Sequence, residues 1–413
     1  MTQFTLPLDI KSLEITKQSF DDKGNIIFDV VSKNDHSICH KCQKLATKRA
    51  GTAPSRLIRH VSILDTQVYL RITPIRYSCE YCNDHTTTTE QYDWCKRNAT
   101  TTNALDDYLM RCLINSTVVD VSKKELIGEK VVENILTRQV GTSVDWVQIT
   151  TLHTLGIDEI ALRKGQDSYV TVISAKTQDN SSPIVIAVLP SREKETVKTF
   201  LQNIPSNLRN TVKHVCTDMY DGYVNADIEV FGVQSLIIDR YHVAKLYRKP
   251  LDKLRTAEMT RLQTELPAEE YAKLEGMMWI LRKNHECLTE ANKQSLELLY
   301  QHSPLLKKAH PYALKLTHIF NTHHSRKLAL AKIDRWINSV ESSGLKVFNK
   351  FIGTLEKYKP YIANYFKDRK NSGFVEGLNN KIKWLKRRCY GLFKPETIFQ
   401  RLFLDLQGYS IYA

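Results

Sequence analysis

The amino-acid sequence predicts a multidomain α+β protein, and three features of its 413 residues lead to that class. Two cysteine pairs lie among alternating, strand-like segments near the N-terminus. Strand-like runs from residue 151 onward are joined first by short connections and then by helices, which is typical of a mixed α/β sheet. Residues 243–365 are rich in Lys, Leu, Glu and Ala, and they interrupt the α/β part with an all-helical block.

The composition indicates a globular chain with a basic surface. Hydrophobic residues make up 42% and charged residues 25%, which is ordinary for a soluble protein. The 59 Lys and Arg residues exceed the 45 Asp and Glu residues by 14, which favours a polyanionic partner such as nucleic acid. The sequence shows neither a signal peptide nor a run of about 18 apolar residues, so we expect a cytoplasmic protein without a membrane segment.

The two cysteine pairs predict a structural metal site. Cys39 and Cys42 form one CxxC knuckle, and Cys79 and Cys82 form the second. Four thiolates held by strands suit the tetrahedral coordination of zinc. The spacer exceeds the usual length of about 15–20 residues, so a hairpin must be inserted between the knuckles. Three other side chains could replace a cysteine ligand and rank behind these four: His36, His40 and Cys95.

Residues 103–140 show helical spacing of apolar residues, in two segments separated near Gly128. A helix-turn-helix that reads DNA needs a tight corner at such a point. A plain helical hairpin that links two domains explains the pattern equally well, because sequence matches to the helix-turn-helix have many false positives.

From residue 151 the expected elements follow the order strand, strand, strand, helix, strand, helix, strand. Short polar connections join the first three strands, which favours an antiparallel meander. Helical crossovers join the last two strands, so the expected sheet is mixed and has helices on its faces. Asp158 then falls in the first strand, Asp218 at the end of the fourth and Asp239 at the end of the last.

A glutamate near the C-terminus is a candidate partner for these aspartates. Glu376 lies on a predicted helix that starts near Ser372 and packs on the sheet, close to Asp158 and Asp218. Neighbouring carboxylates repel one another, and Mg²⁺ relieves that repulsion because it prefers carboxylate and phosphate oxygens. The pattern therefore predicts a two-metal site for phosphoryl transfer. Taken alone, Glu376 is better explained as a favourable charge at a helix start.

The helix that carries Glu376 is strongly basic, and its residues divide between two faces. The apolar face can pack on the sheet and consists of Leu378, Ile382 and Leu385. The polar face continues from Glu376 with side chains suited to phosphates. The candidate DNA contacts are Asn380, Lys383, Lys386, Arg387 and Arg388. Without the nearby acids, such a basic run would be only a solvated surface.

These motifs resemble those of the ISL-three family of bacterial insertion-sequence transposases, and the resemblance covers nearly the whole chain. The segments that carry it are CHKC…CEYC, GIDEIALRKG, TDMYDGY, IIDRYHVAK and NSGFVEGLNNKIKWLKRRCYG. The family has an RNase H-like catalytic domain with an Asp-Asp-Glu triad, which corresponds here to Asp158, Asp218 and Glu376. Asp239 and His242 resemble an Asp-x-x-His signature, which implies an accessory role for both.

The resemblance implies a DDE-type transposase that binds the terminal inverted repeats of an insertion sequence, cleaves DNA strands and transfers them to target DNA. It implies two Mg²⁺ or Mn²⁺ ions at each active site and a structural Zn²⁺. The expected partners are double-stranded DNA and further copies of the chain, in a homodimer or a higher synaptic assembly. The expected location is the bacterial cytoplasm, in association with the nucleoid.

The expected domain boundaries follow these segments. Residues 1–100 form the zinc-binding domain, and residues 101–150 form the helix-turn-helix-like DNA-binding segment. Residues 151–242 begin the RNase H-like catalytic domain, and residues 243–365 form its helical insertion. Residues 366–413 complete the catalytic domain with the basic helix that bears the glutamate.

Two alternatives remain open. The segment HHSR at residues 323–326 fits the HxxR element of tyrosine recombinases, and three candidate nucleophiles follow it: Tyr358, Tyr361 and Tyr365. The other alternative is a zinc-containing DNA-binding regulator whose catalytic domain is inert. Within the triad itself, Glu159 and Asp221 are neighbouring acids that could be mistaken for the metal ligands.

Overall fold

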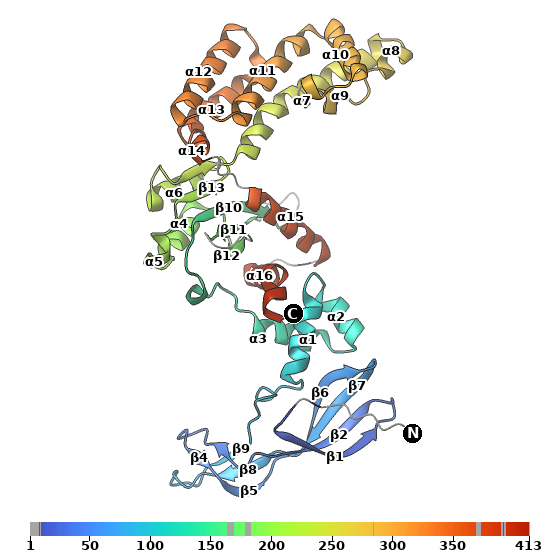
Figure 1. The fold of residues 1–413 in the computed structure, drawn as a ribbon, viewed down its shortest axis with the longest axis vertical. Helices are drawn as coiled ribbons and strands as arrows, with labels where there is room; N and C mark the ends of the chain where they lie inside the picture. The colour runs from blue at the N-terminus through green and yellow to red at the C-terminus, as the bar shows by residue number, and fades with distance from the viewer. Residues whose placement is uncertain are drawn as a thin grey trace. The chain divides into compact units, whose positions relative to one another are not determined.

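The computed structural model of the chain describes residues 8, 10–162, 169–177, 183–283, 285–368, 373–389, 391 and 394–412. Its helices and strands, labelled in Figure 1, belong to two compact units. The first unit comprises Met1–Val140 and Leu404–Ala413, and the second comprises Gly141–Phe403. Each unit has hydrophobic clusters of its own.

Four strands form the main sheet of the first unit, in the order β1-β2-β7-β6. Their bounds are β1 Leu13–Phe20, β2 Ile26–Ser32, β6 Arg56–Ile63 and β7 Thr66–Ile72. The β6–β7 hairpin turns at Leu64 and Asp65, whose φ angles of 47° and 62° suit the two-residue turns that match strand twist. This hairpin is the insertion expected between the two cysteine knuckles, and its buried Ile58 packs with Trp94.

Five short strands surround the cysteine pairs. They are β3 Ser37–Ile38, β4 Leu45–Ala46, β5 Lys48–Thr52, β8 Ile75–Ser78 and β9 Thr87–Thr89. β3 pairs with β4, and the other three form a sheet in the order β5-β8-β9. Tyr77 of β8 is fully buried, and its hydroxyl donates to the carbonyl of Asn34 at 3.1 Å. That bond ties the three-stranded sheet to the segment leading into the first knuckle.

Three helices follow in the first unit: α1 Asn103–Leu113, α2 Val118–Glu125 and α3 Glu129–Gln139. Threonine side chains cap the first two, because Thr102 and Thr117 each accept a bond from a backbone N–H of the first turn. The corner between α2 and α3 uses Leu126 in the left-handed region, with a φ of 50°. Gly128, the residue expected at the corner, has a φ of −62° and precedes α3 instead.

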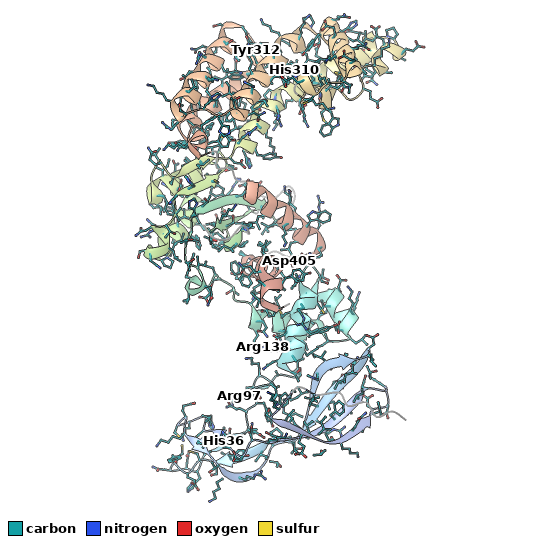
Figure 2. The ribbon with its side chains drawn as sticks, in the orientation of Figure 1. His36, Arg97, Arg138, His310, Tyr312 and Asp405 are labelled. Carbon is teal, nitrogen blue, oxygen red and sulfur yellow. The ribbon has the colours of Figure 1, made fainter. Side chains whose placement is uncertain are left out.

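A fully buried carboxylate joins these helices. Asp106 of α1 accepts a bond from the Thr101 hydroxyl at 2.6 Å and forms an ion pair with Arg138 of α3 (Arg138 is labelled in Figure 2). The same unit includes the end of helix α16 (Pro395–Tyr412), where Asp405 accepts a bond from the backbone N–H of Asn115 at 2.9 Å. The first unit is therefore closed by polar contacts as well as by its hydrophobic core.

The second unit is built on a five-stranded mixed sheet with the order β12-β11-β10-β13-β14. The bounds are β10 Thr154–Ala161, β11 Tyr169–Lys176, β12 Ile184–Leu189, β13 His214–Thr217 and β14 Leu236–Ile238. β10, β11 and β12 pair antiparallel, whereas β13 and β14 join as parallel strands. The predicted meander with two crossover strands is confirmed.

Helices cover this sheet. α4 Lys194–Asn203, α5 Ser206–Arg209 and α6 Asp221–Phe231 lie between β12 and β14 in the chain, and α4 packs against α6. α15 Gly373–Arg388 lies against β10, as Figure 1 shows. Ser372, the expected start of this helix, lies outside the described residues.

The described residues between β14 and α15 are mainly helical, as predicted. Its longer helices are α7 Arg240–Glu265, α10 Glu290–His302, α11 Pro304–Asn321, α12 Arg326–Ser342 and α13 Asn349–Ile362. The described part of residues 268–288, expected to be helical, is broken into α8 Ala268–Ala272, α9 Met277–Ile280 and a 3-10 turn at His285–Cys287. Gly276, between the first two, has a left-handed φ of 76°. None of the described helices combines the length and apolarity needed to cross a bilayer.

We predict that Asp106→Asn destabilises the first unit by about 2 kcal/mol, because it leaves Arg138 without its buried charged partner. Hydrogen exchange of α1 and α3 peptides measures this loss of stability directly. Glu133→Gln removes an exposed ion pair with Lys130 from the same α3 helix and is the matched control, with little change expected. Equal effects of the two substitutions would contradict the assigned role of Asp106.

Candidate active site

Three aspartates lie at neighbouring points of three adjacent strands: Asp158 within β10, Asp218 just after β13 and Asp239 just after β14. Gly156 of β10 lies opposite Cys216 of β13, so two residues further along Asp158 comes level with Asp218. β13 and β14 are also parallel and in register at Thr217 and Ile238, and the next residues are Asp218 and Asp239. Side chains at equivalent positions of paired strands point to the same face. The sheet therefore gathers three carboxyl groups at one edge.

Backbone N–H groups orient each of these carboxylates. Asp158 accepts from the N–H of Glu159 at 2.7 Å, and Asp218 accepts from that of Tyr220 at 3.0 Å. Asp239 caps helix α7 and accepts from the N–H of Tyr241 at 2.9 Å. Such short-range bonds fix the carboxylate orientation without the help of distant segments.

The three aspartates line one cavity of about 800 Å³. Its walls come from β10, from the first turns of α7 and from α15. The lining residues are Asp158, Glu159, Ile160, Ala161, Asp218, Asp239, Tyr241, His242, Lys245, Asn380, Lys383, Lys386 and Arg387. The cavity thus combines acidic groups from strand ends with basic groups from two helices. Arg388, a predicted DNA contact, is not among the described residues that line it.

The electrostatics of the cavity favour a cation beside the aspartates. Burial raises the pKa of Asp218 to about 6, and repulsion from Asp158 and Glu159 adds to that effect. His242 opposes it, since a positive imidazolium would stabilise the Asp218 anion. His242 Nε2 lies 3.8 Å from the Asp239 carboxylate. A divalent cation would stabilise the ionised form of every carboxylate in this group.

The neighbouring acids, Glu159 and Asp221, are engaged with basic side chains. Glu159 forms an ion pair with Arg192 at 3.0 Å, and the Arg192 guanidinium lies 4.3 Å from the ring centre of Tyr169. Asp221 accepts from Lys357 at 2.6 Å. Its position therefore differs from that of Asp218, and Asp221 does not appear among the described residues that line the cavity.

Glu376 lies in the first turns of α15, and its side chain is outside the part of the chain that the structure describes. The helix itself has the two predicted faces. Its apolar side is buried and consists of Leu378, Ile382 and Leu385. Asn380, Lys383 and Arg387 follow Glu376 by four, seven and eleven positions, and all three line the cavity. The prediction that Glu376 shares this helical row with the three lining residues stays a prediction.

Two lining residues, Tyr241 and Lys245, were missed by the sequence analysis. Both lie on α7, directly after the strand that ends before Asp239. A spacing of four puts them on one helical face, which is the signal that could have revealed them. Together with His242, they add the first turns of α7 to the cavity that the α15 cations also line.

The four predicted cysteine ligands form one cluster in the first unit. Their sulfur atoms all lie within 4.8 Å of one another, with Cys39 at 3.9 Å from Cys82 and Cys42 at 3.5 Å from Cys79. A tetrahedral zinc with bonds of about 2.3 Å requires sulfur separations of about 3.8 Å, so the arrangement fits. Backbone N–H groups of the knuckle lower the pKa of Cys39 to about 6, which favours the thiolate that binds metal.

The alternative ligands lie apart from this cluster. Cys95 packs in the core of the main sheet beside Trp94. His40 Nδ1 lies 2.9 Å from the Thr88 hydroxyl, and His36 Nδ1 lies 2.8 Å from the Asp35 carboxylate. In the described part of the first unit, the four cysteines are the group whose ligand atoms could hold a metal ion together.

The tyrosine-recombinase candidates make structural contacts in the helical part of the second unit. Tyr358 is buried and donates to Asp221 at 2.6 Å, while Tyr365 accepts from Arg240 at 3.2 Å. Ser325 caps α12, and Arg326 donates to Asn364 at 3.0 Å. Neither these residues nor Tyr361 are among the described residues that line the aspartate cavity.

Comparisons with known proteins agree with this geometry. A family of transposases matches residues 155–402, which is more than half of the chain. The chain is 28% identical over 373 residues to the transposase for insertion sequence element IS1001 of Bordetella parapertussis, covering 88% of this chain and 87% of that protein. It is 22% identical over 424 residues to the transposase for insertion sequence element IS1557 of Mycobacterium tuberculosis, covering 97% and 93%. The chain belongs to the ISL-three family of insertion-sequence transposases.

Proposed function

We propose that the second unit is an RNase H-like catalytic domain that cleaves and joins DNA at an Asp158, Asp218 and Glu376 triad. The observation that carries the proposal is the level alignment of Asp158 and Asp218 across β10 and β13, in a cavity bordered by basic helices. Three antiparallel strands followed by two parallel crossover strands support the RNase H-like assignment. Membership of a transposase family supports DNA as the substrate.

The donor set fits a divalent metal. Carboxylate oxygens are the ligands that Mg²⁺ and Mn²⁺ prefer, and burial together with repulsion from Asp158 raises the pKa of Asp218, which a bound cation would lower. Asp158 and Asp218, with Glu376 on the facing helix row, would hold the metal, and Asp239 and His242 lie close enough to orient that group. When bound, a pair of such ions activates the attacking oxygen and stabilises the leaving oxygen of a phosphate diester.

The remaining lining residues are suited to hold the DNA backbone. Lys383 and Arg387 of α15 follow Glu376 along one face, so they would contact phosphates flanking the scissile bond. Lys386 donates to the carbonyl of Ala161, and burial lowers its pKa. Asn380 offers a neutral donor and acceptor beside the acids. Lys245 adds a cation from α7.

The reaction would proceed in two displacements at phosphorus. Water attacks the phosphodiester at an end of the insertion sequence, and the 3′ oxygen leaves as the hydroxyl. That 3′ hydroxyl then attacks a target phosphodiester: its oxygen bonds to the target phosphorus, and the target strand's own 3′ oxygen leaves as a hydroxyl. Recognition of the terminal inverted repeats is assigned to the first unit, with its helices α2 and α3. Holding two ends together requires at least two copies of the chain.

We expect Mg²⁺-dependent cutting of a DNA duplex that carries the element's own terminal repeat, and no cutting in EDTA. Asp218→Asn and Glu376→Gln should each slow cutting by roughly a hundredfold or more, since each removes a charged metal ligand. Both variants should still bind the repeat, which a mobility-shift assay verifies.

The matched control is Asp221→Asn, which changes an acid three positions from Asp218 that pairs with Lys357. Cutting should persist in this variant. If cutting is lost in Asp221→Asn but kept in Asp218→Asn, the second metal ligand is Asp221 and the assignment of Asp218 is wrong. Cutting in EDTA with protein covalently joined to DNA would instead support a tyrosine nucleophile, and repeat binding without cutting would support an inert regulator.

We also predict that Lys245→Gln lowers the cutting rate at saturating DNA about tenfold, because a phosphate contact at the cavity is lost. Lys249→Gln removes an exposed charge from the same helix, outside the cavity lining, and should leave the rate unchanged. Single-turnover kinetics compare the two variants. Equal rates would exclude Lys245 from the reaction.

For the cysteine cluster, we predict about one zinc ion in each purified chain, measured by elemental analysis. Cys79→Ser should lose most of that zinc, whereas Cys95→Ser should keep it, because Cys95 packs in a separate hydrophobic core. Retention of zinc in Cys79→Ser would show that the metal binds elsewhere.

A further inference from the structure

A second cavity lies between helices α11 and α12, which pack against each other. Its volume is about 700 Å³, and we call it the α11–α12 groove. The lining residues are Glu286, Tyr312, Leu314, Lys315, His318, Ile319, Asn321, Lys332, Arg335, Trp336 and Ser339. Most are three or four positions apart along their helix, so each helix contributes one continuous face.

Hydrogen bonds fix the floor of this groove. The indole Nε1 of Trp336 donates to the carbonyl of Tyr312 at 2.8 Å, and the Tyr312 hydroxyl donates to the carbonyl of Ser339 at 3.2 Å (Tyr312 in Figure 2). Trp336 is buried, and its ring centre lies 5.8 Å from that of Phe348. These contacts link α11 and α12 directly at the floor of the groove.

The groove is positively charged. Helices α11 and α12 contain seven Lys and Arg residues against two acids, a net charge of +5. No carboxylate of the described residues pairs with Lys315, Lys332 or Arg335. Lys332 Nζ lies 3.2 Å from His324 Nε2, and Arg335 donates to the carbonyl of Ala331 at 3.2 Å. The carboxylate of Asp334 forms an ion pair with Lys359 Nζ at 2.6 Å. Glu286 is the acidic residue in the described lining, against three permanent cations.

We propose that the α11–α12 groove binds the sugar–phosphate backbone of duplex DNA, at a place separate from the aspartate cavity. Cations on two facing helices suit a polyanion whose charges repeat along a strand, and DNA is the polyanion on which the proposed function already rests. The groove contacts would be independent of base sequence. They would add affinity and hold DNA that flanks the cut position, without touching the reacting atoms.

The test measures how affinity for a random-sequence duplex depends on salt, by fluorescence anisotropy without added Mg²⁺. The groove variant combines Lys315→Gln, Lys332→Gln and Arg335→Gln. Each lost phosphate contact reduces the slope of log affinity against log salt by about 0.9, so the slope should become shallower by about 2–3. The matched variant combines Lys307→Gln, Lys327→Gln and Lys346→Gln, which removes the same charge from exposed positions outside the lining.

The groove variant should lose slope, and the matched variant should change by less than about one unit. Equal losses would overturn the proposal, because charge alone would then explain them. An unchanged slope would also overturn the proposal, and an acidic protein surface would then be the candidate ligand of the groove. The charge-preserving set Lys315→Arg, Lys332→Arg and Arg335→Lys should keep the wild-type slope. If the neutral variant unfolds, Lys315→Gln alone should reduce the slope by about 0.9.

The result is independent of catalysis. If the wild-type chain does not cut DNA but the groove variant has a shallower salt slope than the wild type, the proposed function is rejected and the groove proposal is kept. If the wild-type chain cuts its terminal repeat but the groove substitutions leave the salt slope unchanged, the proposed function is kept and the groove proposal is rejected.

Discussion

Repulsion among carboxylates at one edge of the sheet is the constraint around which the second unit is organised. Asp158 lies within β10, and Asp218 and Asp239 directly follow the adjacent parallel strands β13 and β14, so the sheet order itself brings like charges together. Burial raises the pKa of Asp218, which means that the anion is unstable there without a cation. Such a buried carboxyl group adds nothing to stability, which is consistent with the metal site proposed above. The basic helices α7 and α15 border the same cavity and would hold the anionic substrate.

The surrounding charges separate structural acids from candidate ligands. Glu159 and Asp221 lie close to the triad in sequence, yet Arg192 and Lys357 neutralise them. In the first unit, Arg138 likewise neutralises Asp106 in an ion pair. The cysteine cluster has a different purpose: its short strands enclose little apolar surface, and a tetrahedral metal would supply the stability that so small a core lacks.

Much of this arrangement could be predicted from the sequence, because it depends on local pattern. Short connections and helical crossovers were enough to predict the mixed sheet, and CxxC spacing was enough to predict the cysteine cluster. Other features depend on tertiary structure. The left-handed corner at Leu126 contradicts the local preference for glycine, and Tyr241 and Lys245 become site residues only when α7 follows β14 into the cavity. The role of Glu376 stays a prediction, supported by the helix row that it shares with Asn380 and Lys383.

The central claim is that the Glu376 turn of α15 and the aspartate edge of the sheet share one metal site. Replacing Mg²⁺ with Fe²⁺ and adding ascorbate and peroxide generates hydroxyl radicals at the bound metal, and these cut the nearby polypeptide backbone. Mass spectrometry of the fragments then maps the site. The account predicts cuts near Asp158, Asp218 and Glu376, all suppressed by excess Mg²⁺. Cuts near the two aspartates without any near Glu376 would contradict it.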